Sequence, residues 1–298
     1  MSLSPSVIKG FSTYLKLERG LAVHTVESYL HDLRLFDTFL DDREMDFRRV
    51  ELHMLQDFIR TVAELGLQAR SQARVVSGIK AFYKFALTEK LIAVNPTELL
   101  ELPQLPRHLP EILSLKEIDA ILAAIDRSKP EGQRNVAIIE ILYGSGVRVS
   151  ELVGLKLSNI SFEQQYMKVD GKGSKQRLVP LSSRSMEAIR LWLTDRNCLD
   201  IKPKQEDFLF LNRRGSQLTR EMIFTIVRQL ALAAGIKKNV SPHTFRHAFA
   251  THLLEGGANL RAIQQMLGHE SITTTEIYTH IDVEYLRAEI LTKHPRNR

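Results

Sequence analysis

A proline-rich segment divides this chain of 298 residues into two parts. Four of its ten prolines lie between residues 95 and 110, at Pro96, Pro103, Pro106 and Pro110. Proline lacks a backbone N–H donor and disfavours a helical conformation in the residue before it. The segment therefore predicts an extended linker, with the domain boundary near residue 107. Because domains usually hold about 100 to 200 residues, we expect two, 1–107 and 108–298.

The first part has the hydrophobic pattern of an all-helical domain. Apolar residues recur at helical spacing in four runs, at about 6–18, 24–40, 50–65 and 69–89. Thr25 suits the N-cap of the second run, and Gly66 ends the third.

The second part is mixed. Ser114 and Glu117 fit a capping box at the start of a helix, and further helices are predicted at 134–143, 150–155 and from Thr219 onward. Residues 166–181 form two short apolar runs around a glycine-rich turn that carries Lys172, which predicts a β-hairpin. The whole chain is thus predicted to be mainly α with a small β-sheet.

The formal net charge of +6 is confined to the second part. Residues 1–107 hold 14 Lys/Arg and 14 Asp/Glu, whereas residues 108–298 hold 27 and 21. A basic second domain suits a polyanionic partner such as nucleic acid, although many proteins carry this charge without one.

Composition excludes several classes of protein. The single cysteine, Cys198, rules out an internal disulfide framework and a multi-cysteine metal site. No apolar run approaches the ~20 residues that span a bilayer, and the first residues lack the features of a secretory signal. We therefore expect a cytoplasmic protein without membrane insertion.

The fourth predicted helix carries a cationic stripe. Its basic residues fall on one face of the helix, opposite the apolar face: Arg70, Arg74, Lys80 and Lys84. Such a stripe is either the solvated face of an ordinary amphipathic helix or a surface that binds DNA phosphates.

A set of polar residues in the last third has the chemistry of phosphodiester cleavage. His243 and Arg246 share one helix face, at a helix start that Ser241 and Pro242 predict. His269 follows a helix that Gly268 ends, and Tyr278 lies in a polar stretch. Arg148 stands far upstream. Arginine can pair with two phosphate oxygens at once, and tyrosine can act as a covalent nucleophile.

Each of these residues also has a purely structural interpretation. His243 and Arg246 could belong to a hydrogen-bond network, His269 to a helix C-cap and Tyr278 to the core. The i, i+4 spacing of His243 and His247 can bind zinc, but no third ligand accompanies them. Only the ordered set favours catalysis.

In order and approximate spacing, these residues resemble the catalytic set of the tyrosine recombinase (phage integrase) family. The stretch around Tyr278 is similar to the bacterial Xer-type site-specific recombinases. The resemblance implies a helical, SAM-like core-binding domain at 1–107 with its linker and a mixed α/β catalytic domain at 108–298. Together these would form a C-shaped clamp around DNA.

The resemblance also implies a mechanism with six catalytic residues. These are Arg148, Lys172, His243, Arg246, His269 and Tyr278. Tyr278 would attack a DNA phosphate and form a 3′-phosphotyrosyl bond, with the arginines and His269 on the phosphate oxygens. Lys172 would be the general acid and His243 the general base. Neither a metal ion, nor another cofactor, nor ATP is expected.

The family's assembly implies partners. Four protomers would hold two duplexes at a dif-like site, exchange strands through a Holliday junction and resolve chromosome dimers at cell division. A second, XerC-like recombinase and an FtsK-like septal DNA translocase are the expected protein partners. The helix predicted at 283–291, with Leu286 and Ile290 on one face, would either dock on the next protomer or pack on its own domain.

Alternative functions stay open. They are a mobile-element integrase of the same family, a type IB topoisomerase, and a DNA-binding protein without catalysis.

Overall fold

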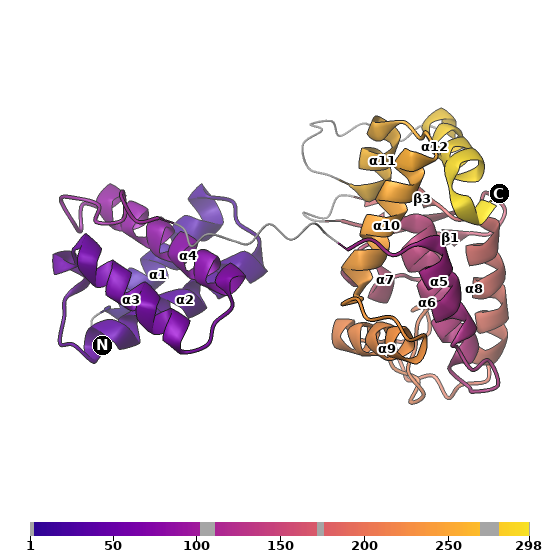
Figure 1. Cartoon of the computed structure of the whole chain (residues 1–298), viewed down its shortest axis with the longest axis horizontal. Helices are drawn as coiled ribbons and strands as arrows, with labels where there is room; N and C mark the ends of the chain where they lie inside the picture. Colours follow the sequence, from indigo (N-terminus) through magenta and orange to yellow (C-terminus); the bar gives the residue numbers. More distant parts are fainter. Residues whose placement is uncertain (1–2, 102–110, 172–175, 269–279, 298) are drawn as a thin grey trace. The chain divides into compact units, whose positions relative to one another are not determined.

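The computed structural model describes residues 3–101, 111–171, 176–268 and 280–297, with the side chains of 280–284 and 297 left aside. Its contacts divide the chain into two compact units, Met1–His108 and Leu109–Arg298 (Figure 1). The predicted fold class, mainly helical with one small sheet, is confirmed.

The described part of the first unit is entirely helical. Its elements are α1 (Pro5–Thr13), a π-helical continuation (Tyr14–Glu18), α2 (Val23–Asp41), a 3-10 turn (Phe47–Arg49), α3 (Leu52–Glu64) and α4 (Ala69–Thr88). The prediction of Thr25 as an N-cap is wrong. The chain enters α2 in an extended conformation at Ala22, whose carbonyl accepts from the amides of Thr25 and Val26, so the N-cap lies three residues earlier than predicted.

Helix α4 supplies much of the core of this unit. Phe82, Tyr83 and Phe85 are buried and pack edge-on or tilted against rings from α1 and α2. The buried hydroxyl of Tyr83 donates to the carbonyl of Phe47, 3.0 Å away. With its apolar face covered in this way, α4 keeps its basic residues on the remaining surface.

The second unit surrounds one buried helix. Its helices are α5 (Leu115–Ala123), α6 (Gly132–Ser145), α7 (Val149–Val153), α8 (Ser183–Arg196), α9 (Arg220–Ala233), α10 (Pro242–Glu255), α11 (Leu260–Leu267) and α12 (His280–Lys293), with 3-10 turns at Leu157–Asn159 and Pro295–Asn297. Helix α6 is buried over almost its whole length and packs on α8 and α10. The capping box predicted at Ser114 and Glu117 is confirmed.

A three-stranded antiparallel sheet lies beside these helices. It consists of β1 (Ile160–Ser161), β2 (Tyr166–Asp170) and β3 (Gln176–Pro180) in that order. The predicted hairpin is confirmed as β2 and β3. Strand β1 was not predicted, because two residues are too few to show the alternation of a strand. Helices α11 and α12 pack on β3 and lie side by side at one end of the unit (Figure 1).

Helix α12 packs on its own unit through the face that the sequence singled out. Leu286 and Ile290 are buried in a cluster with Phe249, Met266 and Leu267. Of the two expectations for this helix, the structure therefore supports packing within the chain for these two side chains.

Left-handed glycines end two helices next to the polar residues of interest. Gly146 ends α6 with φ 59° and Gly268 ends α11 with φ 64°. A residue with a side chain is strained in this conformation. A Cβ at Gly146 would also lie 2.4 Å from the ring of buried Phe249. The turn at Gly146 lets the chain leave α6 and start α7 only three residues later.

Gly146→Ala should therefore destabilise the second unit more than Gly235→Ala. Gly235 has φ 71° but nothing within 4 Å of its missing Cβ, so this variant measures backbone strain alone. We expect a loss of about 1 kcal/mol in the free energy of unfolding for Gly235→Ala and about 3 kcal/mol for Gly146→Ala, which adds overpacking.

Urea unfolding followed by tryptophan fluorescence measures both losses. The single tryptophan, Trp192, is buried in the second unit and reports on that unit. Equal losses would contradict the packing of Phe249 against this turn.

Candidate active site

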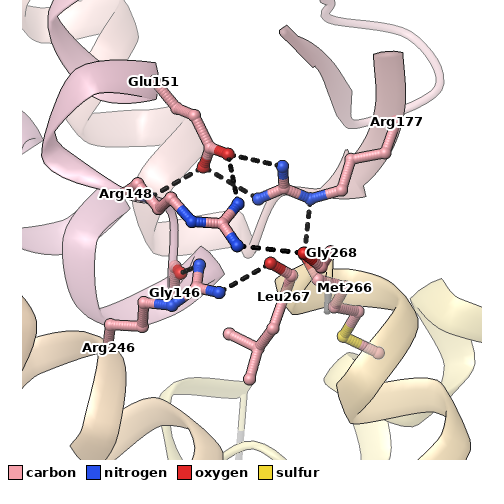
Figure 2. A network of polar contacts seen from close by, with 8 residues as sticks. All are labelled: Gly146, Arg148, Glu151, Arg177, Arg246, Met266, Leu267 and Gly268. Atoms are coloured by element: carbon pink, nitrogen blue, oxygen red, sulfur yellow. Dashed lines mark hydrogen bonds and ion pairs between the residues drawn. The ribbon is translucent and has the colours of Figure 1, made fainter. Parts of the chain in front are cut away.

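Three arginines converge on the C-terminal end of helix α11. Arg177 Nε donates to the carbonyl of Met266 at 2.8 Å, Arg246 Nη2 to that of Leu267 at 2.6 Å, and Arg148 Nη2 to that of Gly268 at 2.9 Å (Figure 2). The last carbonyls of a helix lack partners within it and form the negative end of its dipole. The guanidinium groups satisfy these acceptors and are gathered by them.

One carboxylate holds two of these arginines. Glu151, in the first turn of α7, accepts from Arg177 Nη1 and Nη2 at 2.6 and 2.8 Å and from Arg148 Nη1 at 2.9 Å. It also accepts from the backbone amide of Arg148 at 2.7 Å. Burial raises the pKa of Glu151, but the hydrogen bonds and charge of Arg177, with those from Arg148, lower it overall. Glu151 is therefore an anion at neutral pH.

Arg246 joins this group from helix α10. The helix begins as predicted, with Ser241 as N-cap and Pro242 in the first turn. Arg246 Nη1 donates to the carbonyl of Gly146 at 2.6 Å, so the side chain bridges the ends of α6 and α11. Burial, and to a lesser extent the charge of Arg148, lowers the pKa of Arg246 to about 10, which leaves it cationic at neutral pH.

Positive charge is in excess here. Three guanidinium groups share one carboxylate, and the side chain of Arg148 is 36% exposed. A guanidinium has five N–H donors. The hydrogen bonds among the described residues use two nitrogens each on Arg148 and Arg246, so both keep donors for an anion. Fixed donors of this kind can bind a phosphate and stabilise charge that develops on its oxygens.

The structure brings together two of the six predicted catalytic residues, Arg148 at the N-cap of α7 and Arg246 on α10. His243 is exposed and lies one turn before Arg246 on α10. Lys172, His269 and Tyr278 lie outside the described residues.

The predicted cationic stripe on α4 divides into two kinds of residue. Arg70 and Lys84 are exposed and Lys80 is half-buried. Arg74 instead donates to Asp32 at 2.5 Å and to the carbonyl of Ser28 at 3.2 Å. Burial raises the pKa of Asp32 more than the charge of Arg74 lowers it. Arg74 therefore has a structural partner that its position on the helix wheel did not indicate.

Sequence reasoning missed Arg177 and gave Glu151 no role. The pairing of Arg177 with Val169 places it on the inward side of β3 along with Val179, where an apolar residue is the norm. The adjacent apolar residues Leu178 and Val179 hide this alternation in the sequence. Glu151 stands three residues after Arg148 at a helix start, a position that did signal an N-terminal contact.

Metal and membrane sites find no support in the described ranges. Within these ranges, no group of three or more His, Cys, Asp or Glu side chains could hold a metal ion. Buried His252 makes a hydrogen bond with the hydroxyl of Tyr143 at 2.9 Å, and His247 is exposed. No helix in the described part of the chain is long and apolar enough to cross a membrane.

Glu151→Gln should destabilise the second unit at neutral pH by about 3 kcal/mol, because it leaves buried Arg177 without an anionic partner. The pKa of Glu151 in the folded protein lies below its ordinary value of 4.5. Its contribution is therefore complete above that pH and is lost as the pH falls through the folded pKa.

Urea unfolding monitored by Trp192 at pH 7, 4.5 and 3.5 should show that the difference in free energy of unfolding between wild type and Glu151→Gln narrows as the pH falls. Glu131→Gln is the matched control, because Glu131 pairs with the exposed Arg213 and its loss should cost less than about 1 kcal/mol. A gap of constant size would show that Glu151 is not the ion that the geometry indicates.

Both units match family models. A model described as the phage integrase family matches residues 111–284, and one described as the phage integrase N-terminal SAM-like domain matches residues 8–90. The chain is 42% identical to the tyrosine recombinase XerD of Chlorobaculum tepidum over 292 residues, covering 97% of this chain and 96% of that protein. It is 41% identical to XerD of Pseudomonas aeruginosa over 295 residues, covering 99% of each.

Solved structures show the same fold. The XerA recombinase is 30% identical with a TM-score of 0.50, covering 97% of this chain and 98% of that one. The Tn1549 transposon integrase bound to circular intermediate DNA is 22% identical with a TM-score of 0.72, covering 94% of each chain. At that identity the likeness concerns the fold alone.

The resemblance predicts an Xer-type recombinase nearer to XerD than to XerC, and these relatives carry the XerD name. The chain belongs to the phage integrase family and, within it, to the Xer-type tyrosine recombinases.

Proposed function

We propose that this protein cuts and rejoins DNA at a specific site through Tyr278 and resolves chromosome dimers at cell division. The observation that carries the proposal is the convergence of Arg148 and Arg246 at the end of α11, with positive charge in excess and donors to spare. A phosphodiester in the transition state of cleavage is the anion that this arrangement suits.

The chemistry divides among few groups. Arg148 and Arg246 would hold the non-bridging oxygens, where negative charge grows as the fifth bond to phosphorus forms. The Tyr278 oxygen forms that bond and loses its proton to His243, while the bond to the 5′-oxygen breaks and Lys172 protonates the leaving group. His269 would donate to the same phosphate.

The reaction needs no energy source. The phosphotyrosyl bond conserves the energy of the broken phosphodiester, so attack by a 5′-hydroxyl on this bond rejoins the strand without ATP. The charge that metal ions supply in many nucleases comes from the arginines, so the proposal includes no cofactor.

The substrate is expected to be a dif-like duplex held by a tetramer in the cytoplasm. Among the structural relatives, XerH was solved on a difH substrate, with a TM-score of 0.68 at 22% identity. The tetramer would hold two duplexes and exchange strands through a Holliday-junction intermediate. A XerC-like second recombinase and an FtsK-like translocase are the proposed protein partners.

The first unit is proposed to contribute DNA contacts from α4. Arg70 and Lys84 are exposed and suited to phosphate contacts, with Lys80 between them. Arg74 is expected to contribute less to DNA binding, because its guanidinium already pairs with Asp32.

A mobile-element integrase is the alternative that the fold of the Tn1549 integrase keeps open. The near-complete coverage of XerD relatives favours the chromosomal role. Recombination between two dif-like sites on one circular DNA distinguishes the two.

Tyr278→Phe should bind the target duplex with wild-type affinity yet form no covalent complex. The test incubates each protein with a nicked duplex carrying a dif-like site in EDTA and separates the products on a denaturing gel. A shifted band for wild type alone would support metal-free tyrosine catalysis.

A missing wild-type band calls for the same incubation with the second Xer recombinase added, because one protomer can be inactive alone. Continued absence of the band would reduce the proposal to DNA binding without catalysis. A band from Tyr278→Phe would overturn the choice of nucleophile.

Arg70→Ala and Lys84→Ala should each weaken DNA binding uniformly across sequences. Each loss of one phosphate contact should reduce the slope of log K against log salt by about 1. Binding titrations between 50 and 200 mM salt measure this slope.

Arg74→Ala is the matched comparison on the same helix. It should instead speed hydrogen exchange in the first unit, with a loss of about 1–2 kcal/mol, because Asp32 keeps its burial and loses its partner. A change of salt slope without faster exchange would restore Arg74 to the DNA-binding surface.

A further inference from the structure

We propose that Arg177 is a positioning residue that keeps the positive charge of Arg148 available to the scissile phosphate, an inference that rests on the proposed function. Arg177 is 6% exposed and does not itself face solvent. Arg177 lies on β3, opposite Val169 of β2. Burial of a cation at such a position is unfavourable unless partners compensate for its lost hydration.

Those partners account for each of its nitrogens. Nη1 and Nη2 each donate a hydrogen bond to one oxygen of Glu151 in a forked pair, and Nε donates to the carbonyl of Met266. This parallel, two-bond geometry is the strongest that arginine makes with a carboxylate. Arg177 therefore fixes both the position and the orientation of Glu151.

Charge balance gives this contact its consequence. Glu151 is the only carboxylate that either Arg148 or Arg177 bonds among the described residues. While Arg177 neutralises it, Arg148 uses one nitrogen on Glu151 Oε1 and keeps most of its charge uncompensated. Without Arg177, Glu151 is free to pair with Arg148 in full and would withdraw both charge and donors from the phosphate.

The end of α11 is fixed by the same side chain. A Cβ added at Gly268 would lie 3.2 Å from Cδ and Nε of Arg177, so the glycine backbone rests directly on the guanidinium. The carbonyl of Gly268 is in turn the acceptor of Arg148 Nη2. Arg177 thus fixes the positions of both groups that orient Arg148, the carboxylate of Glu151 and the carbonyl of Gly268.

Arg177→Met tests this role on two nicked substrates, one with an ordinary scissile phosphate and one with a methylphosphonate. The methyl group removes the charge of one non-bridging oxygen, so cleavage depends less on cationic groups. On the phosphate, we expect covalent-complex formation to slow by about 100-fold with DNA binding unchanged, the size of effect seen when one transition-state donor is lost. On the methylphosphonate, the defect should shrink to about 10-fold or less, since less charge needs to be stabilised.

Glu151→Gln combined with Arg177→Met provides the decisive comparison. The double variant loses more contacts than Arg177→Met but carries no carboxylate to neutralise Arg148, so it should cleave the phosphate faster than the single variant. A purely structural role predicts the reverse. The double variant removes buried Glu151 together with its forked partner Arg177, so it carries the substrate comparison if Arg177→Met does not fold.

Arg196→Met is the matched control. Arg196 is another buried arginine of this unit, and it donates to the carbonyls of Phe208 and Glu206, away from the site. Its loss should lower stability, followed through Trp192, and leave the ratio of rates on the two substrates unchanged.

An equal defect for Arg177→Met on both substrates, or a double variant slower than the single one, would overturn the role of Arg177 while leaving wild-type cleavage intact. Failure of wild type to form the covalent complex on either substrate would instead overturn the proposed function itself.

Discussion

The second unit has to offset the electrostatic repulsion among three buried or half-buried guanidinium groups, and the rest of the site depends on how it does so. Burial lowers the pKa of Arg246, and Arg148 and Arg177 lie close enough that their charges lower it further. Glu151 and the three last carbonyls of α11 offset this repulsion. Because these acceptors are fixed by a helix end and a helix start, the cationic groups are oriented before any phosphate arrives. That order is what electrostatic stabilisation of a transition state requires.

Local sequence signals predicted most elements, because helices are specified by nearby residues. The capping box at Ser114, the helix start at Ser241 and the hairpin around residues 166–181 are all present. The error at Thr25 arose because Ala22, an unremarkable residue, begins α2 by its backbone conformation alone.

The site itself could not be assembled from local patterns. Arg177 meets Glu151 across 26 residues of chain and Met266 across 89, and such pairs leave no periodic signal. The same holds for Arg74, whose partner Asp32 is 42 residues away. Resemblance to a family identified Arg148 and Arg246 as a pair, because the order of the family's motifs links residues whose contact the spacing in one sequence does not indicate. It did not indicate the residues that orient them.

The attachment of Arg246 to the carbonyl of Gly146 has a dynamic consequence. Gly146 ends α6, the helix whose side chains are buried along almost its whole length. Backbone groups in such a helix exchange with solvent only when the surrounding core opens as a whole, whereas loops fluctuate on their own. The part of the site at Gly146 is therefore expected to open only as often as the native core does. Motions that accompany strand cleavage are therefore expected in segments that open more easily than this buried helix.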